Sequence, residues 1–187
     1  SGLGEAIVHA ASEHPEFDYL AVEVYKPGLA DLLLKMGQAE VTNVRCVQAN
    51  APEVLDHLLD AASVDEIWVF FPDPWHKSRH HKRRLVSPAF AEKVARVLKP
   101  GGVWRLATDW DEYALVMREV MESAPDFENL HPGEGATAED PQGGWAPRWD
   151  GRILTSFERK AGEAGRRAHD LASVSYTHLT LPTNREV

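Results

Sequence analysis

The sequence has almost no cysteine and no long apolar segment. Cys46 is the single cysteine among 187 residues, which excludes an intramolecular disulfide and argues against a thiolate metal cluster. No apolar run approaches the roughly 20 residues that a membrane-spanning helix needs, and no secretory signal is visible. The composition, 43% hydrophobic and 26% charged, is typical of a globular domain. We therefore predict a cytoplasmic protein with no membrane association.

Positive charge is scarce overall but concentrated in one place. The formal net charge of −9 argues against general coating of nucleic acid. The segment from His76 to Arg84, however, holds five cations and three histidines and no acid. This patch predicts an anionic partner, with phosphate contacts from Arg79, Lys82, Arg83 and Arg84. The same cations disfavour a divalent ion at the histidines, so we expect no metal.

Both ends of the sequence depart from the pattern of the middle. Gly2-Leu3-Gly4 reads as a glycine-rich turn before a helix, but no strand precedes it, so we expect the first strand of the fold to be missing. The segment from Val174 onward has no pattern continuous with what precedes it and resembles a translated sequencing adapter. We therefore assign residues 1–172 to one domain and residues 173–187 to a non-native tail.

Strand-like and helix-like segments alternate between these ends. Strands are expected at 17–24, 44–48, 64–71, 103–108 and 152–159. Helices are expected at 4–13, 29–36, 51–62, 88–98 and 111–122, with a loop at 129–149. This alternation predicts a doubly wound α/β fold, a mostly parallel sheet with helices on both faces. Ligands bind at the carboxyl ends of the strands in such sheets, and these ends carry Glu23, Asn50, Asp73 and Asp109.

Two of these residues indicate a nucleotide-like cofactor. Glu23 follows the glycines by about twenty residues, a position from which an acid accepts hydrogen bonds from ribose hydroxyls. The spacing does not say which adenosine cofactor binds, and a solvated strand end is an equal alternative for Glu23. Asn50 suits an adenine edge because an amide both donates and accepts. It also suits the N-cap of the following helix, and the two roles are compatible.

The most informative motif follows the strand at 64–71. Pro72-Asp73-Pro74 places one carboxylate between two prolines that restrict the backbone. Trp75 offers a ring on which a base can stack, and the basic run follows at once. Thr108-Asp109-Trp110 repeats the pattern at the next strand end, with a helix N-cap as the alternative role. The combination predicts an active site around residues 70–77.

These motifs resemble the bacterial tRNA (guanine-N7)-methyltransferase family over residues 1–172. The resemblance is carried by Phe70-Phe71-Pro72-Asp73-Pro74-Trp75-His76-Lys77, Ala107-Thr108-Asp109-Trp110 and Thr155-Ser156-Phe157-Glu158. It implies a Rossmann-like class I methyltransferase fold with S-adenosylmethionine as cofactor and tRNA as partner. The reaction it implies is methylation of guanine N7 in the tRNA variable loop. The oligomeric state stays open between a monomer and a homodimer.

The resemblance also implies a role for individual residues. Glu23 and Asn50, with the turn that contains Gly2 and Gly4, contact the cofactor. Asp73 is the catalytic residue and lies close to the cofactor. The guanosine is held by Lys77, Asp109, Thr155, Ser156, Phe157 and Glu158. Three departures stand out: an acidic residue of the family would precede Ser1, Asn50 replaces a common Asp, and Ser156 replaces a common Lys.

The chemistry of guanine N7 limits what the carboxylates have to do. N7 carries an in-plane lone pair, so no general base is needed, and we expect catalysis from positioning and from charge stabilisation. We predict that Asp73 orients the base and stabilises its growing positive charge rather than removing a proton. Asp73 or Asp109 can also accept hydrogen bonds from guanine N1–H and N2–H, which would exclude adenine.

Three other functions fit parts of the sequence. Asp73-Pro74-Trp75 is similar to the Asn/Asp-Pro-Pro-aromatic motif of methyltransferases that act on exocyclic amines, although only one proline follows Asp73. A noncatalytic RNA-binding fragment is expected if truncation removes the cofactor pocket. A nicotinamide oxidoreductase fits the glycine turn and Glu23 but gives the basic run no role.

Overall fold

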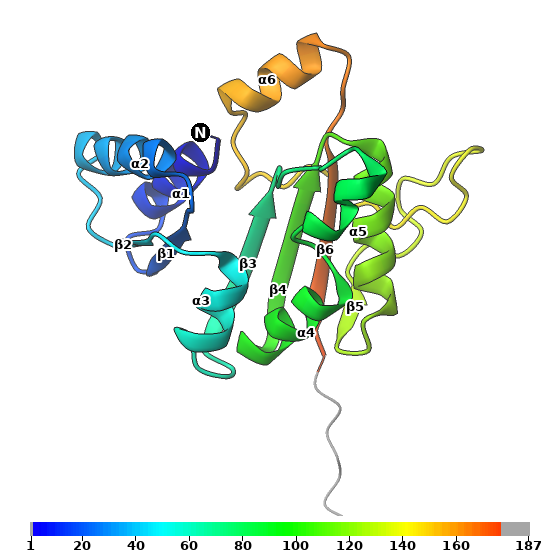
Figure 1. The fold of residues 1–187 in the computed structure, drawn as a ribbon, viewed down its shortest axis with the longest axis horizontal. Coiled ribbons are helices and arrows are strands. Elements are labelled where there is room, and N and C mark those ends of the chain that lie inside the picture. The colour runs from blue at the N-terminus through cyan, green and yellow to red at the C-terminus, as the bar shows by residue number, and fades with distance from the viewer. Residues whose placement is uncertain (1, 177–187) are drawn as a thin grey trace, which may run out of the picture.

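The chain folds into an α/β molecule whose strands form two sheets (Figure 1). The computed structural model describes residues 2–176. The helices are α1 (Gly2–Glu13), α2 (Lys26–Gln38), α3 (Ala51–His57), α4 (Pro88–Val97), α5 (Asp111–Ser123), α6 (Ser156–Glu163) and the 3-10 helix η1 (Ser78–Arg83). The strands are β1 (Tyr19–Val22), β2 (Val44–Val47), β3 (Val64–Phe70), β4 (Leu98–Thr108), β5 (Phe127–Asn129) and β6 (His169–Ser175). No helix in residues 2–176 is both long and apolar enough to cross a membrane.

The two sheets meet along edges that are not paired with each other. β1 and β2 form a parallel pair, and the second sheet has the order β3-β4-β6-β5, with β6 antiparallel to both of its neighbours. Between the two sheets, the rings of Tyr19 on β1 and Trp68 on β3 have centroids 6.0 Å apart.

The main hydrophobic core surrounds β4. Trp104 and Leu106 of this strand are fully buried against α4 and α5, which contribute Val94 and Met117 among others. Burying a side chain of this size stabilises a fold by about 1.5–3 kcal/mol. A smaller core joins α1, α2 and the β1–β2 pair. The larger core therefore fixes the carboxyl ends of β3 and β4, which are followed by most of the predicted site residues.

The structure departs from the sequence predictions at four places, one of which is β5, a strand that the sequence does not predict. α1 begins at Gly2, so Gly2 and Gly4 lie in a helix and the predicted glycine turn is wrong. The predicted strand at 152–159 is also wrong, because α6 begins at Ser156 after an N-cap in which the Thr155 hydroxyl accepts from Glu158 N at 3.2 Å. β6 was not predicted, and it includes residues 173–175 of the predicted tail. Residues 177–187 lie outside the described residues.

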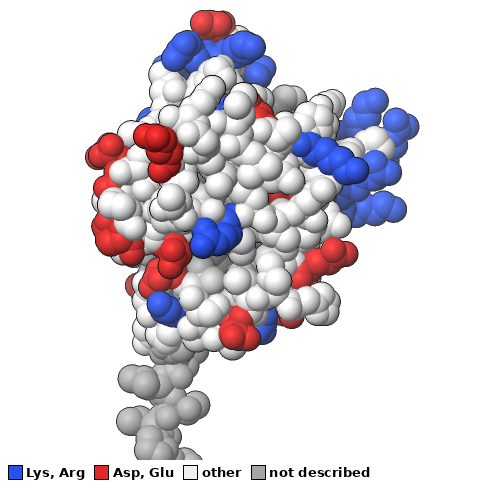
Figure 2. All heavy atoms as spheres, turned by 90° about the vertical axis from the view of Figure 1, so that its left-hand side faces the viewer, with Lys and Arg blue, Asp and Glu red and all other residues white. Residues whose placement is uncertain are grey.

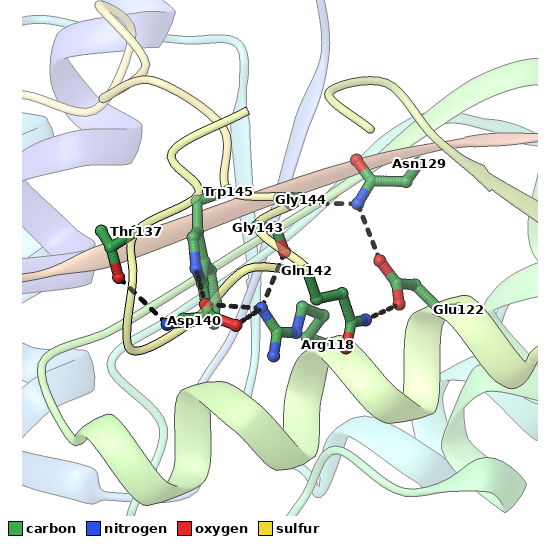
Figure 3. A network of polar contacts seen from close by, with 9 residues as sticks. All are labelled: Arg118, Glu122, Asn129, Thr137, Asp140, Gln142, Gly143, Gly144 and Trp145. Atoms are coloured by element: carbon green, nitrogen blue, oxygen red, sulfur yellow. Dashed lines mark hydrogen bonds and ion pairs between the residues drawn. The ribbon is translucent and has the colours of Figure 1, made fainter. Parts of the chain in front are cut away.

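A buried arginine orders the long loop that follows β5 (Figure 3). Arg118 on α5 donates to both Asp140 carboxylate oxygens at 3.0 and 2.8 Å and to the Gly143 carbonyl at 2.7 Å. Its guanidinium also lies 4.7 Å from the ring centroid of Trp145, whose indole donates to Asp140 at 2.7 Å. All three contacts are made by Arg118 Nη1, and hydrogen bonds from a charged donor are stronger than neutral ones, so they hold this loop against α5.

Candidate functional site

Asp73 and Asp109 lie at the same edge of the larger sheet. Phe70 and Ala107 are paired in the parallel β3–β4 ladder, and Phe71 N donates to Ala107 O at 2.8 Å. Asp73 comes three residues after Phe70, and Asp109 comes two residues after Ala107. Asp73 is exposed, while the side chain of Asp109 retains only 14% exposure. The structure therefore brings together the two acids that the sequence predicts at neighbouring strand ends.

The backbone on both sides of Asp73 is in a conformation that L-residues rarely adopt. Phe71 has φ +52° and Trp75 has φ +41°, and neither residue is glycine. Such residues cost of order 1–3 kcal/mol each and persist where the surroundings hold them. Arg84 Nε donates to the Pro74 carbonyl at 2.7 Å and fixes the segment from outside. The prolines predict a restricted segment, but they do not predict these strained neighbours.

Arg84, which the sequence predicts as a phosphate contact, is buried among protein groups. Only 7% of the residue is exposed, and its guanidinium bonds the Glu112 carboxylate and lies 4.6 Å from the Tyr113 ring centroid. The hydrogen bond from Arg84 holds the pKa of Glu112 below 4.5. The donors of Arg84 therefore face protein groups, and its predicted phosphate contact stays a prediction.

The other cations of the basic run face solvent. Lys77, Arg79, Lys82 and Arg83 are exposed on or beside η1. Arg83 lies over the Trp75 ring at 5.1 Å from its centroid, so one face of the predicted stacking platform is covered. Figure 2 shows that Lys and Arg side chains gather in separate groups instead of being spread evenly over the surface. Concentrated cations of this kind suit the regular phosphates of a nucleic acid.

The segment from Thr155 to Glu158 lies next to the motif at the end of β3. The Phe157 ring is 5.4 Å from that of Phe71, although Phe157 remains 47% exposed. Glu158 accepts hydrogen bonds from Arg148 at 3.0 Å and from Arg152 at 2.6 Å. Burial raises the pKa of Glu158, but the two arginines outweigh it and hold this pKa below 4.5. The Glu158 carboxylate therefore lies beside Phe157 with a side chain that is 11% exposed, and both of its oxygens accept from arginines.

Asp109 is oriented by a residue beyond α6. Arg166 Nε donates to Asp109 Oδ2 at 2.8 Å. The pair borders a cleft of about 640 Å³ that Trp110, Glu112 and His169 also line. Sequence reasoning missed Arg166, since nothing in its local pattern links it to Asp109, which is 57 residues away. No group of three or more potential metal ligands occurs within residues 2–176.

Glu23 and Asn50 lie at the corresponding edge of the smaller sheet. Glu23 N donates to Val47 O at 3.1 Å, which places Glu23 directly after the paired ends of β1 and β2. One Glu23 oxygen accepts from Tyr25 N at 2.9 Å, and the other would lie 3.2 Å from a Cβ on Gly28. Asn50 occupies the N-cap of α3 but makes no side-chain cap bond. These two side chains have the donors and acceptors that an adenosine group needs.

Comparison with known proteins agrees with this geometry. A family model described as "Putative methyltransferase" matches residues 1–171. The tRNA (guanine-N(7)-)-methyltransferase of Paenarthrobacter aurescens (strain TC1) is 50% identical over an alignment of 209 positions. The alignment covers 91% of this chain and 69% of that protein. The enzyme of the same name from Cutibacterium acnes (strain DSM 16379 / KPA171202) is 45% identical over 170 residues, or 91% of this chain and 59% of that protein.

The chain belongs to the tRNA (guanine-N7)-methyltransferase family. It spans about two thirds of the length of the curated family members that it matches. Solved structures support the class I methyltransferase fold. An rRNA methylase from Streptococcus thermophilus gives a TM-score of 0.52 at 12% identity, covering 86% of this chain and 74% of that one. TrmN from Thermus thermophilus gives 0.57 at 15% identity, covering 91% and 40%.

The residues predicted to contact the cofactor lie in two kinds of local structure. Glu23 and Asn50 follow paired parallel strands and fit an adenosine group, as described above. Gly2 and Gly4 do not form a cradle, because Gly4 packs in α1 with Leu32 atoms 3.7 Å from the place of a Cβ. The cofactor contacts predicted for Glu23, Asn50 and Asp73 stay predictions, and the predicted turn is replaced by the start of α1.

Proposed function

We propose that this chain transfers a methyl group from S-adenosylmethionine to N7 of a guanine in the tRNA variable loop. The observation that carries the proposal is the position of Asp73 and Asp109 at the ends of two paired strands of a family member. The exposed cations beside Asp73 hold the RNA phosphates. The reaction takes place in the cytoplasm, with the chain acting as a monomer or a homodimer.

Two side chains bind the adenosine part of the cofactor. The Glu23 carboxylate accepts hydrogen bonds from the ribose hydroxyls, and the Asn50 amide pairs with the adenine edge. S-adenosylmethionine supplies an electrophilic methyl group on a positively charged sulfur. Asp73, exposed at the edge of the larger sheet, completes this site from the opposite side.

The acids at the strand ends orient the guanine and stabilise its charge. With the cofactor bound, the N7–carbon bond would form as the sulfur–carbon bond breaks, neutral S-adenosylhomocysteine would leave, and the imidazole half of the base would carry the positive charge. Asp73 stabilises that charge without accepting a proton. Asp109, oriented by Arg166, and Glu158, ionised beside Phe157, accept from N1–H and N2–H. Adenine lacks this pair of donors, so it is excluded. Lys77, Thr155 and Ser156 complete the guanosine contacts.

The experiment is methylation of tRNA with labelled S-adenosylmethionine, followed by nuclease mapping of the product. We expect 7-methylguanosine in the variable loop. Asp73→Asn should lower turnover by about 10²–10³-fold, as loss of one preorganised electrostatic group does, with the affinity for S-adenosylmethionine largely kept. Glu128→Gln, which neutralises an exposed acid on β5, is the matched control and should be fully active. Full activity of Asp73→Asn would overturn the role of Asp73.

The same measurements separate the alternative functions. N6-methyladenosine in the product would identify an enzyme that acts on exocyclic amines. Retained tRNA binding without any binding of S-adenosylmethionine would identify a noncatalytic RNA-binding protein. Either result would contradict the proposal.

A further inference from the structure

Arg152 is buried beside Glu158 and Phe71, although neither the motif nor the proposed reaction assigns it a role. Its side chain is 1% exposed. It donates to both Asp170 oxygens at 3.1 and 2.6 Å and to Glu158 at 2.6 Å. The guanidinium carbon lies 5.3 Å from the ring centroid of Phe71. One planar group thus contacts three segments that are distant in sequence.

These three segments are the ones whose relative position the reaction requires. Phe71 directly precedes Pro72 and Asp73, and Glu158 belongs to the first turn of α6. Asp170 lies on β6 opposite Ala107 of β4 and thereby anchors the fork to the sheet. A buried cation is tolerated only when it is fully paired. Arg152 meets that condition by holding α6 against the end of β3.

The geometry of the guanidinium makes this contact directional. Arginine presents its donors in a rigid fork and stacks on aromatic rings, whereas the lysine ammonium is a point charge on a flexible stem. A lysine at this position would keep the positive charge but could not bond Asp170 and Glu158 in fixed directions while covering Phe71. The fork therefore sets where the Glu158 carboxylate stands relative to the Asp73 segment.

We propose that Arg152 is a positioning residue for the methyl transfer, which fixes Glu158 relative to the segment that carries Asp73. The inference rests on the proposed function, since Glu158 is its guanosine acceptor. Arg152 does not touch the substrate; it acts through Glu158 and Phe71. The charged groups that face Glu158 are Arg148 and Arg152. The guanidinium of Arg152 also pairs with the carboxylate of Asp170 on β6.

The test compares Arg152→Lys with Arg118→Lys. Arg118 is also buried, bonds both oxygens of Asp140 and covers an indole ring, so the same change is made away from the site. Arg152→Lys should lower kcat for tRNA by about 10²-fold, as misplacement by 1 Å does, with KM for S-adenosylmethionine unchanged. Arg118→Lys should lower thermal stability without this loss of kcat.

A pH profile supplies a readout that a purely structural role would not move. Arg152 helps to hold the pKa of Glu158 below its ordinary value. Its replacement raises that pKa, so the acid limb of the kcat profile should move to higher pH. Asp170→Asn, which loosens the fork but keeps the cation, is a second variant and should give a smaller loss of kcat.

The outcomes distinguish the inference from the function on which it rests. A wild-type chain that does not methylate guanine N7 would contradict both. Wild-type methylation with an unchanged kcat in Arg152→Lys and Asp170→Asn would overturn the inference alone. Equal losses of kcat in the Arg152 and Arg118 variants, with no shift of the pH limb, would also overturn it.

Discussion

At the scale of single residues, neighbouring arginines in the basic run have opposite surroundings. Arg83 is exposed over Trp75, whereas Arg84 is buried against Glu112 and the Pro74 carbonyl. A run of like charges in sequence does not say which members turn inward. Arg84 is buried and Arg83 is not because η1 ends between them, so that their side chains point to different sides.

This difference predicts different effects for Arg83→Gln and Arg84→Gln. Arg83→Gln should change the free energy of unfolding by no more than about 0.5 kcal/mol, as surface changes do. It should also reduce the slope of log binding constant against log salt concentration for tRNA by about one. Arg84→Gln should destabilise the fold by about 2 kcal/mol, the scale of a lost charge-assisted bond. Urea unfolding and binding titrations at several salt concentrations measure both effects. If Arg83→Gln leaves the salt dependence of tRNA binding unchanged, Arg83 does not contact a phosphate.

Two glycines give a matched test of the cofactor site. A Cβ on Gly28 would stand 3.2 Å from a Glu23 oxygen, a close contact that pushes the carboxylate away. Gly28→Ala should therefore raise KM for S-adenosylmethionine. Gly4→Ala meets only ordinary contacts in α1 and should stabilise the helix by up to about 1 kcal/mol with KM unchanged. A raised KM in Gly4→Ala would restore the glycine turn as a cofactor contact.

At the scale of elements, helix caps separate stability from function. Ser87 caps α4 by accepting from Phe90 N at 3.2 Å, and Thr155 caps α6 in the same way. Each serine or threonine to alanine change at an N-cap costs about 1 kcal/mol. Ser87→Ala should lower stability and leave turnover intact, whereas Thr155→Ala should lower both. Thr155→Ser keeps the cap hydroxyl and should retain most of both; unfolding curves and turnover numbers check this.

The same elements show what the sequence could predict. Apolar periodicity predicts the strands and helices between residues 17 and 123, because those segments bury one face or both. The segment 152–159 was predicted as a strand from its β-branched and aromatic residues. Its Thr155-x-x-Glu158 spacing is a capping-box pattern and would have indicated the helix. The partners of Glu158 and Asp109 could not be predicted, since Arg152 and Arg166 reach them only through the folded chain.

At the scale of the whole molecule, the two sheets should differ in local stability. β4 is bonded on both sides by β3 and β6, and its central side chains are fully buried. Among the described strands, β1 is bonded only to β2. Amides of Tyr19–Val22 should therefore exchange faster than those of residues 103–108, because weakly packed units open at lower free energy. Hydrogen exchange followed by mass spectrometry measures this, and equal protection would show one cooperative unit.

The place of β6 in the sheet has a consequence for synthesis of the chain. β6 is the last described strand, yet it lies between β4 and β5. Until residue 175 has left the ribosome, β5 has no partner and β4 is paired on one side only. Domains fold from the N-terminus as they emerge. The smaller sheet can therefore assemble early, whereas the larger sheet is incomplete until β6 has emerged. Completion of the site, which includes the Arg152–Asp170 contact, must then follow the emergence of β6.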